Sequence, residues 1–297
     1  MNYIIIGGGF GLYGYLPALL VTGNRVLLPK KYRQRILSRP DLIELESQIT
    51  WVPTLDDGLR EAHTVIIATQ PSVQVELVNR IVDDFCNVKR FYLEKPISET
   101  PLAGDNLLIK LKGKSKSVAV GFLFLQCLWI KQLENAVKSN DFVNILWTFE
   151  AHHFRNGIRN WKRYHNMGGG PLRFYGIHLI AVLSFLGYSY VESSKIESSN
   201  GYDATRWEAH FKHPNLAYCK VIVDTFNNSY IFKISTTSTI EVNMKDPFDE
   251  ITTETENTDR RISMIVTYLN DEGMNDLIML RKINMLWMNI EEKTKWV

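Results

Sequence analysis

The sequence predicts an α/β protein in two parts: a doubly wound parallel sheet over residues 1–118, and an α+β domain over residues 119–297 whose open sheet is mostly antiparallel. Three observations support this prediction. A run of β-branched residues meets a cluster of glycines at the start of the chain. Strands alternate with helices through the first part, which favours a parallel sheet. In the second part, segments of alternating apolar and polar residues follow one another closely.

The first predicted strand ends in a turn that suits a nucleotide. Residues 4–6 are isoleucines, and the glycines within residues 7–11 let the backbone approach a phosphate closely. A helix over residues 16–20 should follow, with its N-terminal N–H groups facing an anion above the turn. Leu12 occupies the place where this pattern usually has a third glycine. The expected dinucleotide contacts are Gly7, Gly9, Phe10 and Gly11.

The second strand, residues 25–28, bears on the choice of cofactor. A carboxylate just after this strand would accept hydrogen bonds from a ribose 2′-hydroxyl. The chain instead has Lys30 and Lys31 there, with no acid beside them. A basic cluster suits a 2′-phosphate, so NADP is favoured over NAD as the cofactor. The alternative interpretation is a solvated, basic first turn of a helix.

Two further strands of the first part end in residues that can reach the same ligand. One covers residues 64–69 and is followed by a helix over residues 73–82, with Ser72 as its expected N-cap. The other covers residues 91–93 and runs into a Glu-Lys-Pro tripeptide. Ligands of such sheets bind at the carboxyl ends of the strands. The expected cofactor contacts here are Thr69, Gln70, Pro71, Glu94 and Lys95.

Lys95 is the candidate for proton transfer. A lysine at the end of a parallel strand can hydrogen-bond a substrate hydroxyl or carbonyl, and Pro96 fixes the turn that aims it. Next to a cationic nicotinamide ring, the lysine would lose its proton more easily. The alternative is an exposed ion pair between Lys95 and Glu94, which would need no other role.

The second part is predicted to begin with a strand, a helix and a strand over residues 118–125, 126–138 and 144–151. Antiparallel strands are expected further on, over residues 207–211, 217–225, 230–236 and 239–242. Residues 249–259 are acidic and rich in threonine, which is typical of an exposed loop. Residues 274–290 predict a closing helix whose apolar stripe packs into the core.

A second cluster of candidate residues surrounds three consecutive glycines, residues 168–170, which let the backbone approach another element or a ligand. Trp161 precedes them. The helix expected over residues 172–186 places Tyr175 and His178 on one face, because they are three residues apart. A histidine on that face can relay a proton, whereas an isolated histidine among apolar residues is more often a hydrogen-bonded core residue.

Together these motifs resemble the glucose-fructose oxidoreductase, inositol dehydrogenase and rhizopine catabolism (Gfo/Idh/MocA) family. The resemblance covers nearly the whole chain, in the family's order, from the glycine turn through the 68–72 and 94–96 segments to His178. It implies an N-terminal Rossmann domain, a C-terminal sheet that often forms a dimer face, and hydride transfer between NAD(P) and a sugar or cyclitol carbon. It also implies that Lys95 handles the proton, with His178 as the second catalytic residue; Tyr175 is a third candidate.

Departures from the family pattern bear on the substrate. The family's usual aspartate, four residues before the histidine, falls on Phe174, and its usual histidine after Pro-Ser is Gln74. The substrate is therefore either unlike a common sugar, or the proton path lacks this acid. We expect an NAD(P)-dependent oxidoreductase acting on a sugar, nucleotide sugar or related small polar carbonyl or alcohol. The alternatives are a reductase of an imine or tetrapyrrole-like substrate and a non-catalytic dinucleotide-binding sensor or assembly subunit. The expected substrate contacts are His153, Trp161, Arg163 and Phe174.

The amino-acid composition limits the classes of molecule that the protein is expected to bind. The net charge of +2 and the lack of a long apolar run argue against nucleic-acid and membrane partners and favour a cytoplasmic protein that acts on a small molecule. The three cysteines are widely scattered, and no carboxylate or thiolate accompanies the histidines with ligand spacing, so no metal is expected. The resemblance implies a homo-dimer or tetramer through the C-terminal sheet.

Overall fold

The computed structural model describes residues 1–198, 200, 203–251, 259–270 and 276–297. The chain forms two compact units, each described by itself below. The first unit contains Met1–Ile97, Asn106–Leu123 and Ile251–Leu280, and the second contains Ser98–Asp105, Phe124–Glu250 and Arg281–Val297. The chain thus returns to the first unit at Ile251–Leu280. The predicted division, with one boundary after residue 118, has no such return.

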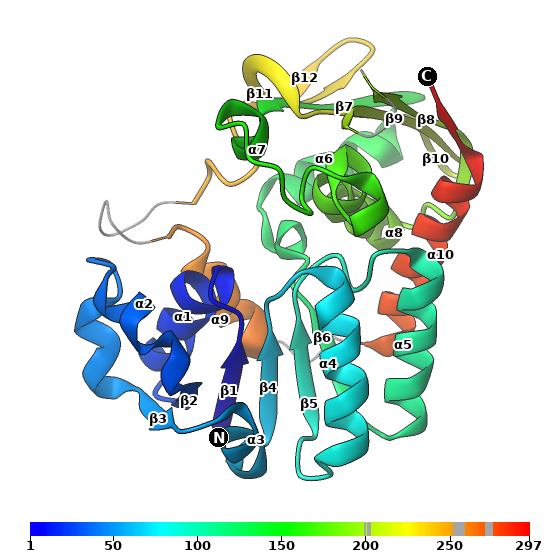
Figure 1. Ribbon diagram of the computed structural model, residues 1–297. Helices are drawn as coiled ribbons and strands as arrows, with labels where there is room; N and C mark the ends of the chain where they lie inside the picture. Colours follow the sequence, from blue (N-terminus) through cyan, green and yellow to red (C-terminus); the bar gives the residue numbers. More distant parts are fainter. Residues whose placement is uncertain (199, 201–202, 252–258, 271–275) are drawn as a thin grey trace. The chain divides into compact units, whose positions relative to one another are not determined.

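In the described residues, the first unit contains a six-stranded sheet in which every neighbouring pair is parallel, with the order β3-β2-β1-β4-β5-β6 (Figure 1). This order is that of a Rossmann fold, and it reverses between β1 and β4. The isoleucines of β1 are buried because helices cover the sheet on both faces. The strands are β1 (Asn2–Ile6), β2 (Arg25–Pro29), β3 (Thr50–Val52), β4 (Thr64–Ile67), β5 (Arg90–Leu93) and β6 (Ser117–Val120).

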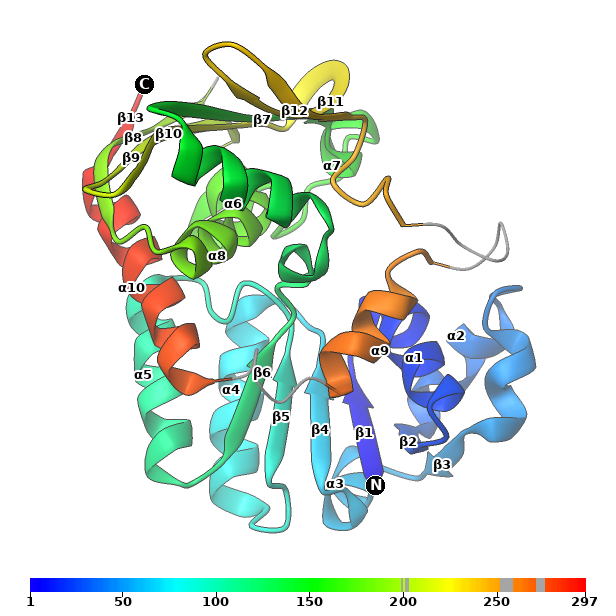
Figure 2. The same ribbon diagram turned by 180° about the vertical axis from the view of Figure 1, so that it is seen from behind.

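The two helices predicted for the first unit, after the glycine turn and over residues 73–82, are both present with local differences. The helix after the glycine turn begins with a π-helical segment, Gly11–Tyr15, and continues as α1 (Leu16–Val21). The predicted N-cap Ser72 is wrong, because α4 begins at Pro71, two residues before the predicted start, and Gln70 is the cap. Helix α9 (Ile262–Asn270) lies beside α1 (Figures 1 and 2). The remaining helices are α2 (Arg33–Leu37), α3 (Leu55–Glu61), α4 (Pro71–Asp84) and, from Asn106 on, α5 (Pro101–Gly113), whose first residues belong to the second unit.

The described part of the second unit contains a seven-stranded sheet with the order β12-β11-β7-β10-β9-β8-β13. Its pairs are antiparallel except for β10 with β7 and β13 with β8, so the predicted mostly antiparallel sheet is confirmed. The strands are β7 (Phe142–Glu150), β8 (Tyr190–Ser198), β9 (Ala204–His213), β10 (Leu216–Asp224), β11 (Phe226–Thr236), β12 (Ile240–Met244) and β13 (Thr294–Trp296).

Helices α6 (Trp129–Ser139) and α8 (Ile177–Leu186) lie on one side of this sheet (Figure 2). The predicted strand over residues 118–125 is too long, because β6 ends at Val120 and a short 3₁₀ turn, Leu123–Gln126, follows. The predicted helix over residues 172–186 starts with a π-helical segment, Pro171–Gly176. The closing helix is α10 (Leu277–Lys293), and short α7 covers His152–Arg155. Most of the predicted 249–259 loop and residues 274–275 of the predicted helix lie outside the described residues.

Candidate functional site

The glycine turn lies where the ends of β1 and β4 meet. Gly7 has φ +136°, and a Cβ there would stand 2.1 Å from the carbonyl oxygen of Ala68, at the end of β4. Only glycine therefore lets the two strand ends approach this closely. At Gly9, by contrast, no described atom other than those of Gly9 and its chain neighbours lies within 4 Å of the Cβ position, so the turn is open at that residue.

Two side chains reach this turn from the segment after β2. The Gly7 N–H donates to the Tyr32 hydroxyl at 3.1 Å, and the Arg35 guanidinium donates to the Gly8 carbonyl oxygen at 2.8 Å. The predicted cofactor contacts Lys30 and Lys31 are exposed on the turn between β2 and α2. Sequence reasoning missed Tyr32 and Arg35, although both belong to the basic segment that follows β2.

The other predicted cofactor contacts follow β4 and β5, which are neighbours in the sheet. Thr69, Gln70 and Pro71 follow β4, and Glu94 is tied to the same place because its N–H donates to the Ile67 carbonyl oxygen at 3.0 Å. Lys95 follows Glu94 and is joined to Pro96 by a cis peptide bond. The carboxyl ends of β1, β4 and β5 thus carry the residues expected to bind the dinucleotide in this unit, except Lys30 and Lys31, which follow β2.

Gln74 and Tyr15 hold the turn that carries Lys95, and sequence reasoning assigned neither of them a site role. The buried Gln74 amide spans the turn backbone, with its nitrogen 2.8 Å from the Glu94 carbonyl oxygen. The Tyr15 hydroxyl donates to the Glu94 carboxylate at 2.8 Å. Burial, and then that carboxylate, raise the pKa of Tyr15 well above its ordinary value, so Tyr15 remains a hydrogen-bond donor.

The residues before α9 add a charged pair beside the glycine turn. The Arg261 guanidinium lies 4.4 Å from the centre of the Phe10 ring and makes two hydrogen bonds to the Asp259 carboxylate, at 2.9 and 2.6 Å. Burial alone would lower the pKa of Arg261, but the pair with Asp259 raises it, so the cation is retained. Nothing in the sequence pattern marks this late segment as part of the first unit.

In the second unit, Tyr175 lies in an aromatic cluster. Its ring centre is 4.8 Å from that of Phe174, 4.9 Å from Phe149 and 5.8 Å from Trp147. Phe174 also contacts Trp161, with ring centres 5.1 Å apart. Burial raises the pKa of Tyr175, so its hydroxyl stays protonated across the physiological range. The predicted site residues Trp161, Phe174 and Tyr175 therefore share one aromatic cluster.

The predicted histidines differ in their surroundings. His178 is buried and stacks on Phe124, with ring centres 4.5 Å apart. The His153 ring centre lies 6.3 Å from that of Tyr175. Burial, and then the charges of Arg163 and Lys162, lower the pKa of His153 to about 4, so it is neutral at pH 7. Within the described residues, His153 Nε2 is buried without a hydrogen-bond partner.

Arg163 forms an ion pair with an acidic residue of the second unit. Its guanidinium makes two hydrogen bonds to the Asp203 carboxylate, at 2.7 and 2.6 Å. It also lies 4.9 Å from the centre of the Phe154 ring. This bidentate geometry holds Arg163 between Asp203 and Phe154. The predicted role of Arg163 as a substrate contact remains a prediction.

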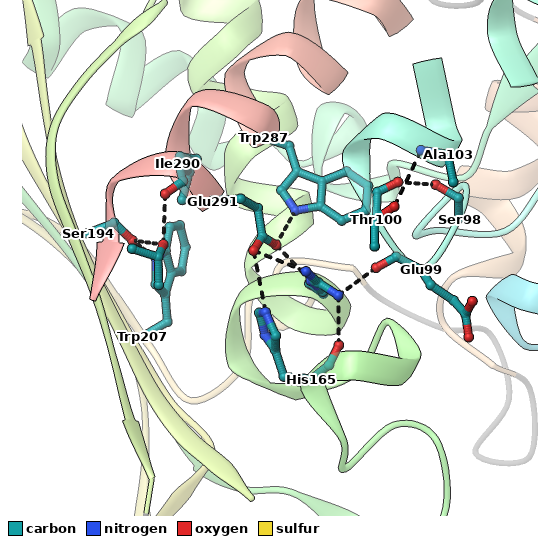
Figure 3. Close-up of polar contacts among 12 residues, drawn as sticks. Ser98, Glu99, Thr100, Ala103, His165, Ser194, Trp207, Trp287, Ile290 and Glu291 are labelled. Carbon is teal, nitrogen blue, oxygen red and sulfur yellow. Dashed lines mark hydrogen bonds and ion pairs between the residues drawn. The ribbon is translucent and has the colours of Figure 1, made fainter. Parts of the chain in front are cut away.

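A buried ionic cluster anchors the segment that carries Phe174 and Tyr175 (Figure 3). Arg173 donates to both carboxylate oxygens of Glu291, at 2.7 and 3.1 Å, and to the carbonyl oxygens of Glu99 and His165. Trp287 Nε1 donates to the same carboxylate at 2.9 Å, and His165 Nε2 lies 3.4 Å from it. Burial would raise the pKa of Glu291, but His165 and Arg173 lower it to about 2.

The described residues contain neither a metal-ligand cluster nor a membrane-spanning helix. Among the residues that the structure describes, no three histidine, cysteine, aspartate or glutamate side chains gather as metal ligands would. Within the same residues, every helix is too short or too polar to cross a bilayer. Lys95 belongs to the first unit, and Tyr175 and His178 belong to the second.

The chain is similar in fold to several solved structures, although no protein-family model and no curated protein matches it. KijD10, a 3-ketoreductase from Actinomadura kijaniata in complex with NADP and TDP-benzene, is 11% identical with a TM-score of 0.71, covering 100% of this chain and 98% of that one. The WlbA dehydrogenase from Bordetella pertussis, in complex with NADH and UDP-GlcNAcA, is 14% identical with a TM-score of 0.69, covering 98% and 95%. An oxidoreductase from Agrobacterium radiobacter, in complex with NAD+, L-tartaric acid and magnesium, is 12% identical with a TM-score of 0.70, covering 99% and 96%.

Proposed function

We propose that the protein is an oxidoreductase that transfers a hydride between a nicotinamide dinucleotide, preferably NADP, and a sugar, nucleotide sugar or related small polar carbonyl or alcohol. The observation that carries this proposal is the convergence within the first unit. The open glycine turn, the 69–71 segment and the turn with Lys95 follow neighbouring strands at the point where the strand order reverses. Dinucleotides bind at that point of such sheets. Two proteins of the same fold, one in complex with NADP and TDP-benzene and the other in complex with NADH and UDP-GlcNAcA, support the substrate class.

The glycine turn fits a dinucleotide because its backbone is open at Gly9. The residues that would hold the cofactor are Gly9, Phe10 and Gly11 at the pyrophosphate, and Lys30, Lys31 and Arg35 at a 2′-phosphate. When bound, the nicotinamide supplies or accepts the hydride. In the reducing direction the Lys95 ammonium donates a proton to the carbonyl oxygen, and in the oxidising direction the neutral amine accepts a proton from the hydroxyl.

The role of Lys95 is tested by Lys95→Ala. Binding of NADPH is followed by tryptophan quenching, and turnover is measured on a panel of sugar, nucleotide-sugar and simple carbonyls. Removal of a general acid should lower kcat by about 10²-fold or more while NADPH still binds. Lys89→Ala, just before the opposite end of β5, is the control and should leave turnover unchanged. An unchanged kcat in Lys95→Ala would refute the assigned role.

The aromatic cluster around Tyr175 favours a second candidate, a reductase of an imine or a tetrapyrrole-like substrate. Phe149, Trp147 and Phe174 offer flat apolar faces and no hydroxyl-binding carboxylate. Turnover of a cyclic imine or a bilin, with none on the sugar panel, would select this candidate. Binding of NADPH without turnover of either panel would instead select a non-catalytic dinucleotide-binding protein.

A further inference from the structure

We propose that Gln74 is a positioning residue that fixes the turn carrying Lys95 and so sets where the lysine amine stands. This inference rests on the proposed function of Lys95. Gln74 lies in the first turn of α4 and is fully buried. A buried amide must satisfy both its N–H groups and its oxygen, so its partners show what it holds in place.

All the described partners of the Gln74 side chain are backbone atoms of the segment around Lys95. The Nε2 group lies 2.8, 3.2 and 3.1 Å from the carbonyl oxygens of Glu94, Pro96 and Ile97. The Oε1 atom accepts from the Glu94 N–H at 3.1 Å. The amide therefore bridges the backbone on both sides of Lys95, which fixes the peptide from which the lysine side chain starts.

A second hold on the same turn comes from the helix that follows the glycine turn. The Glu94 carboxylate accepts a hydrogen bond from the Tyr15 hydroxyl. A Cβ at Gly121 would stand 2.8 Å from Glu94 Oε1 and 2.8 Å from the Tyr15 hydroxyl oxygen, so a glycine at this position leaves room for the pair. The backbone of Glu94 is thus held by α4 and its side chain by the π-helical segment. Gln74 is not itself an expected cofactor contact, so a change there should act through the Glu94–Lys95 turn and leave the expected contacts of the glycine turn in place.

The competing explanation is that Gln74 only stabilises the fold. Asn87 provides a matched control, because its Nδ2 group donates to three backbone carbonyl oxygens, those of Leu59, Arg60 and Ala62, at 2.7, 3.2 and 2.7 Å. These carbonyls precede β4 and Asn87 precedes β5, so this amide lies at the amino ends of the strands, away from Lys95. Gln74→Met and Asn87→Leu each replace the amide by an apolar group of similar shape.

The test follows the amine of Lys95 directly. The protein is reductively methylated with ¹³C-formaldehyde, the Lys95 resonance is assigned with Lys95→Arg, and its pH titration is recorded by NMR. We expect Gln74→Met to move the titration midpoint or the resonance and to lower kcat by roughly 10–100-fold, since a displacement of about 1 Å can cost that much. KM and the NADPH dissociation constant should change by less than about 3-fold, because uniform binding is retained.

Asn87→Leu should lower the unfolding temperature by a similar amount but leave the Lys95 titration and the kcat of the folded protein unchanged. If Gln74→Met behaves like Asn87→Leu in every readout, the amide is structural only and the proposal fails. The NMR readout needs no substrate, so it remains decisive if the protein shows no turnover. Wild-type kcat in Lys95→Ala would refute the catalytic role of Lys95, whereas a Lys95 signal unmoved in both titration midpoint and resonance in Gln74→Met would refute the role of Gln74.

Discussion

Arg35 is a cation that hydrogen-bonds to the backbone of the glycine turn. It comes from α2, is largely solvent-exposed, and donates to the Gly8 carbonyl oxygen at 2.8 Å. A guanidinium beside the expected cofactor site can also bind a 2′-phosphate in a bidentate manner. Lys30 and Lys31, which the sequence pattern singled out, lie on the same connection but show no such contact with the turn in the described residues.

We therefore expect Arg35→Ala to weaken NADPH binding by about 10–100-fold, since hydrogen bonds to charged groups contribute ~1.5–3 kcal/mol. NADH binding should change much less, because NADH lacks the 2′-phosphate. Isothermal titration with both cofactors checks this. Arg33→Ala is the matched control, since Arg33 lies in the same helix and pairs with Glu46 at 2.9 Å. Equal losses for NADPH and NADH would contradict a role at the 2′-phosphate.

For single residues, the sequence predicts which residue types belong to the site better than it predicts which distant side chains contact them. The glycine turn and Lys95 were predicted from motifs whose residues are adjacent in the chain. Arg35 and Gln74 were not, because their partners lie 27 and about 20 residues away and depend on how α2 and α4 are oriented on the sheet. Phe174 was expected at the substrate, and the structure shows it within an aromatic cluster.

The three-glycine segment shows why an element needs a particular residue. A Cβ at Gly169 would stand 2.1 Å from the carbonyl oxygen of Trp161, and the Gly170 N–H donates to the Lys162 carbonyl oxygen at 2.8 Å. The two chain segments thus pack backbone against backbone. This contact places Trp161 against Phe174.

Gly169→Ala should therefore lower the free energy of unfolding by roughly 1–3 kcal/mol, because the Trp161 backbone must move to admit the methyl group. Urea unfolding measures this loss. Gly113→Ala is the control: apart from its chain neighbours and its own helix backbone, no described atom lies within 4 Å of the Cβ position, so the stability of this variant should be unchanged or raised by up to about 1 kcal/mol. A Gly169→Ala protein as stable as the wild type would show that the segment can open at little cost.

In the first unit β1, β2, β4 and β5 were predicted because each is an apolar run, whereas the three-residue β3 was not predicted. In the second unit β8 and β13 were not predicted, and both belong to the end of the sheet where β13 is the edge strand. The chain of β13 follows α10 directly, so its pairing with β8, about 100 residues away, leaves no local pattern. The π-helical starts of two helices also have no local sequence signal.

For the whole molecule, the least predictable feature was which distant chain segments belong to the same unit. Within the second unit, Arg281 pairs with Asp105 across 176 residues and Arg173 pairs with Glu291 across 118. Such pairs close long loops, and nothing in the neighbouring sequence specifies the partner. Assembly through the seven-stranded sheet and a cytoplasmic location remain predictions.

The pair of Arg173 and Glu291 makes the stability of the whole protein depend on pH. The pKa of Glu291 falls from its ordinary 4.5 to about 2 on folding, and burial lowers the pKa of His165 below its ordinary 6.5. Both groups bind a proton less readily in the folded chain than in the unfolded chain. Stability is therefore fully present above these ordinary values and is lost as the pH falls, first through His165 and then, between pH 4.5 and about 2, through Glu291.

Glu291→Gln tests the loss of stability that comes from protonation of Glu291. At pH 7 the variant should unfold more easily than the wild type by on the order of 3 kcal/mol, because it leaves the Arg173 guanidinium buried without its carboxylate. The difference should shrink steadily below pH 4.5 and nearly vanish near pH 2, where the wild-type carboxylate is itself protonated. Urea unfolding across this pH range measures it. Glu61→Gln, which removes a half-exposed pair with Arg25, should cost at most about 1 kcal/mol at any pH. A Glu291→Gln deficit that stays constant from pH 7 to pH 3 would mean that packing of the side chain, rather than its charge, stabilises this cluster.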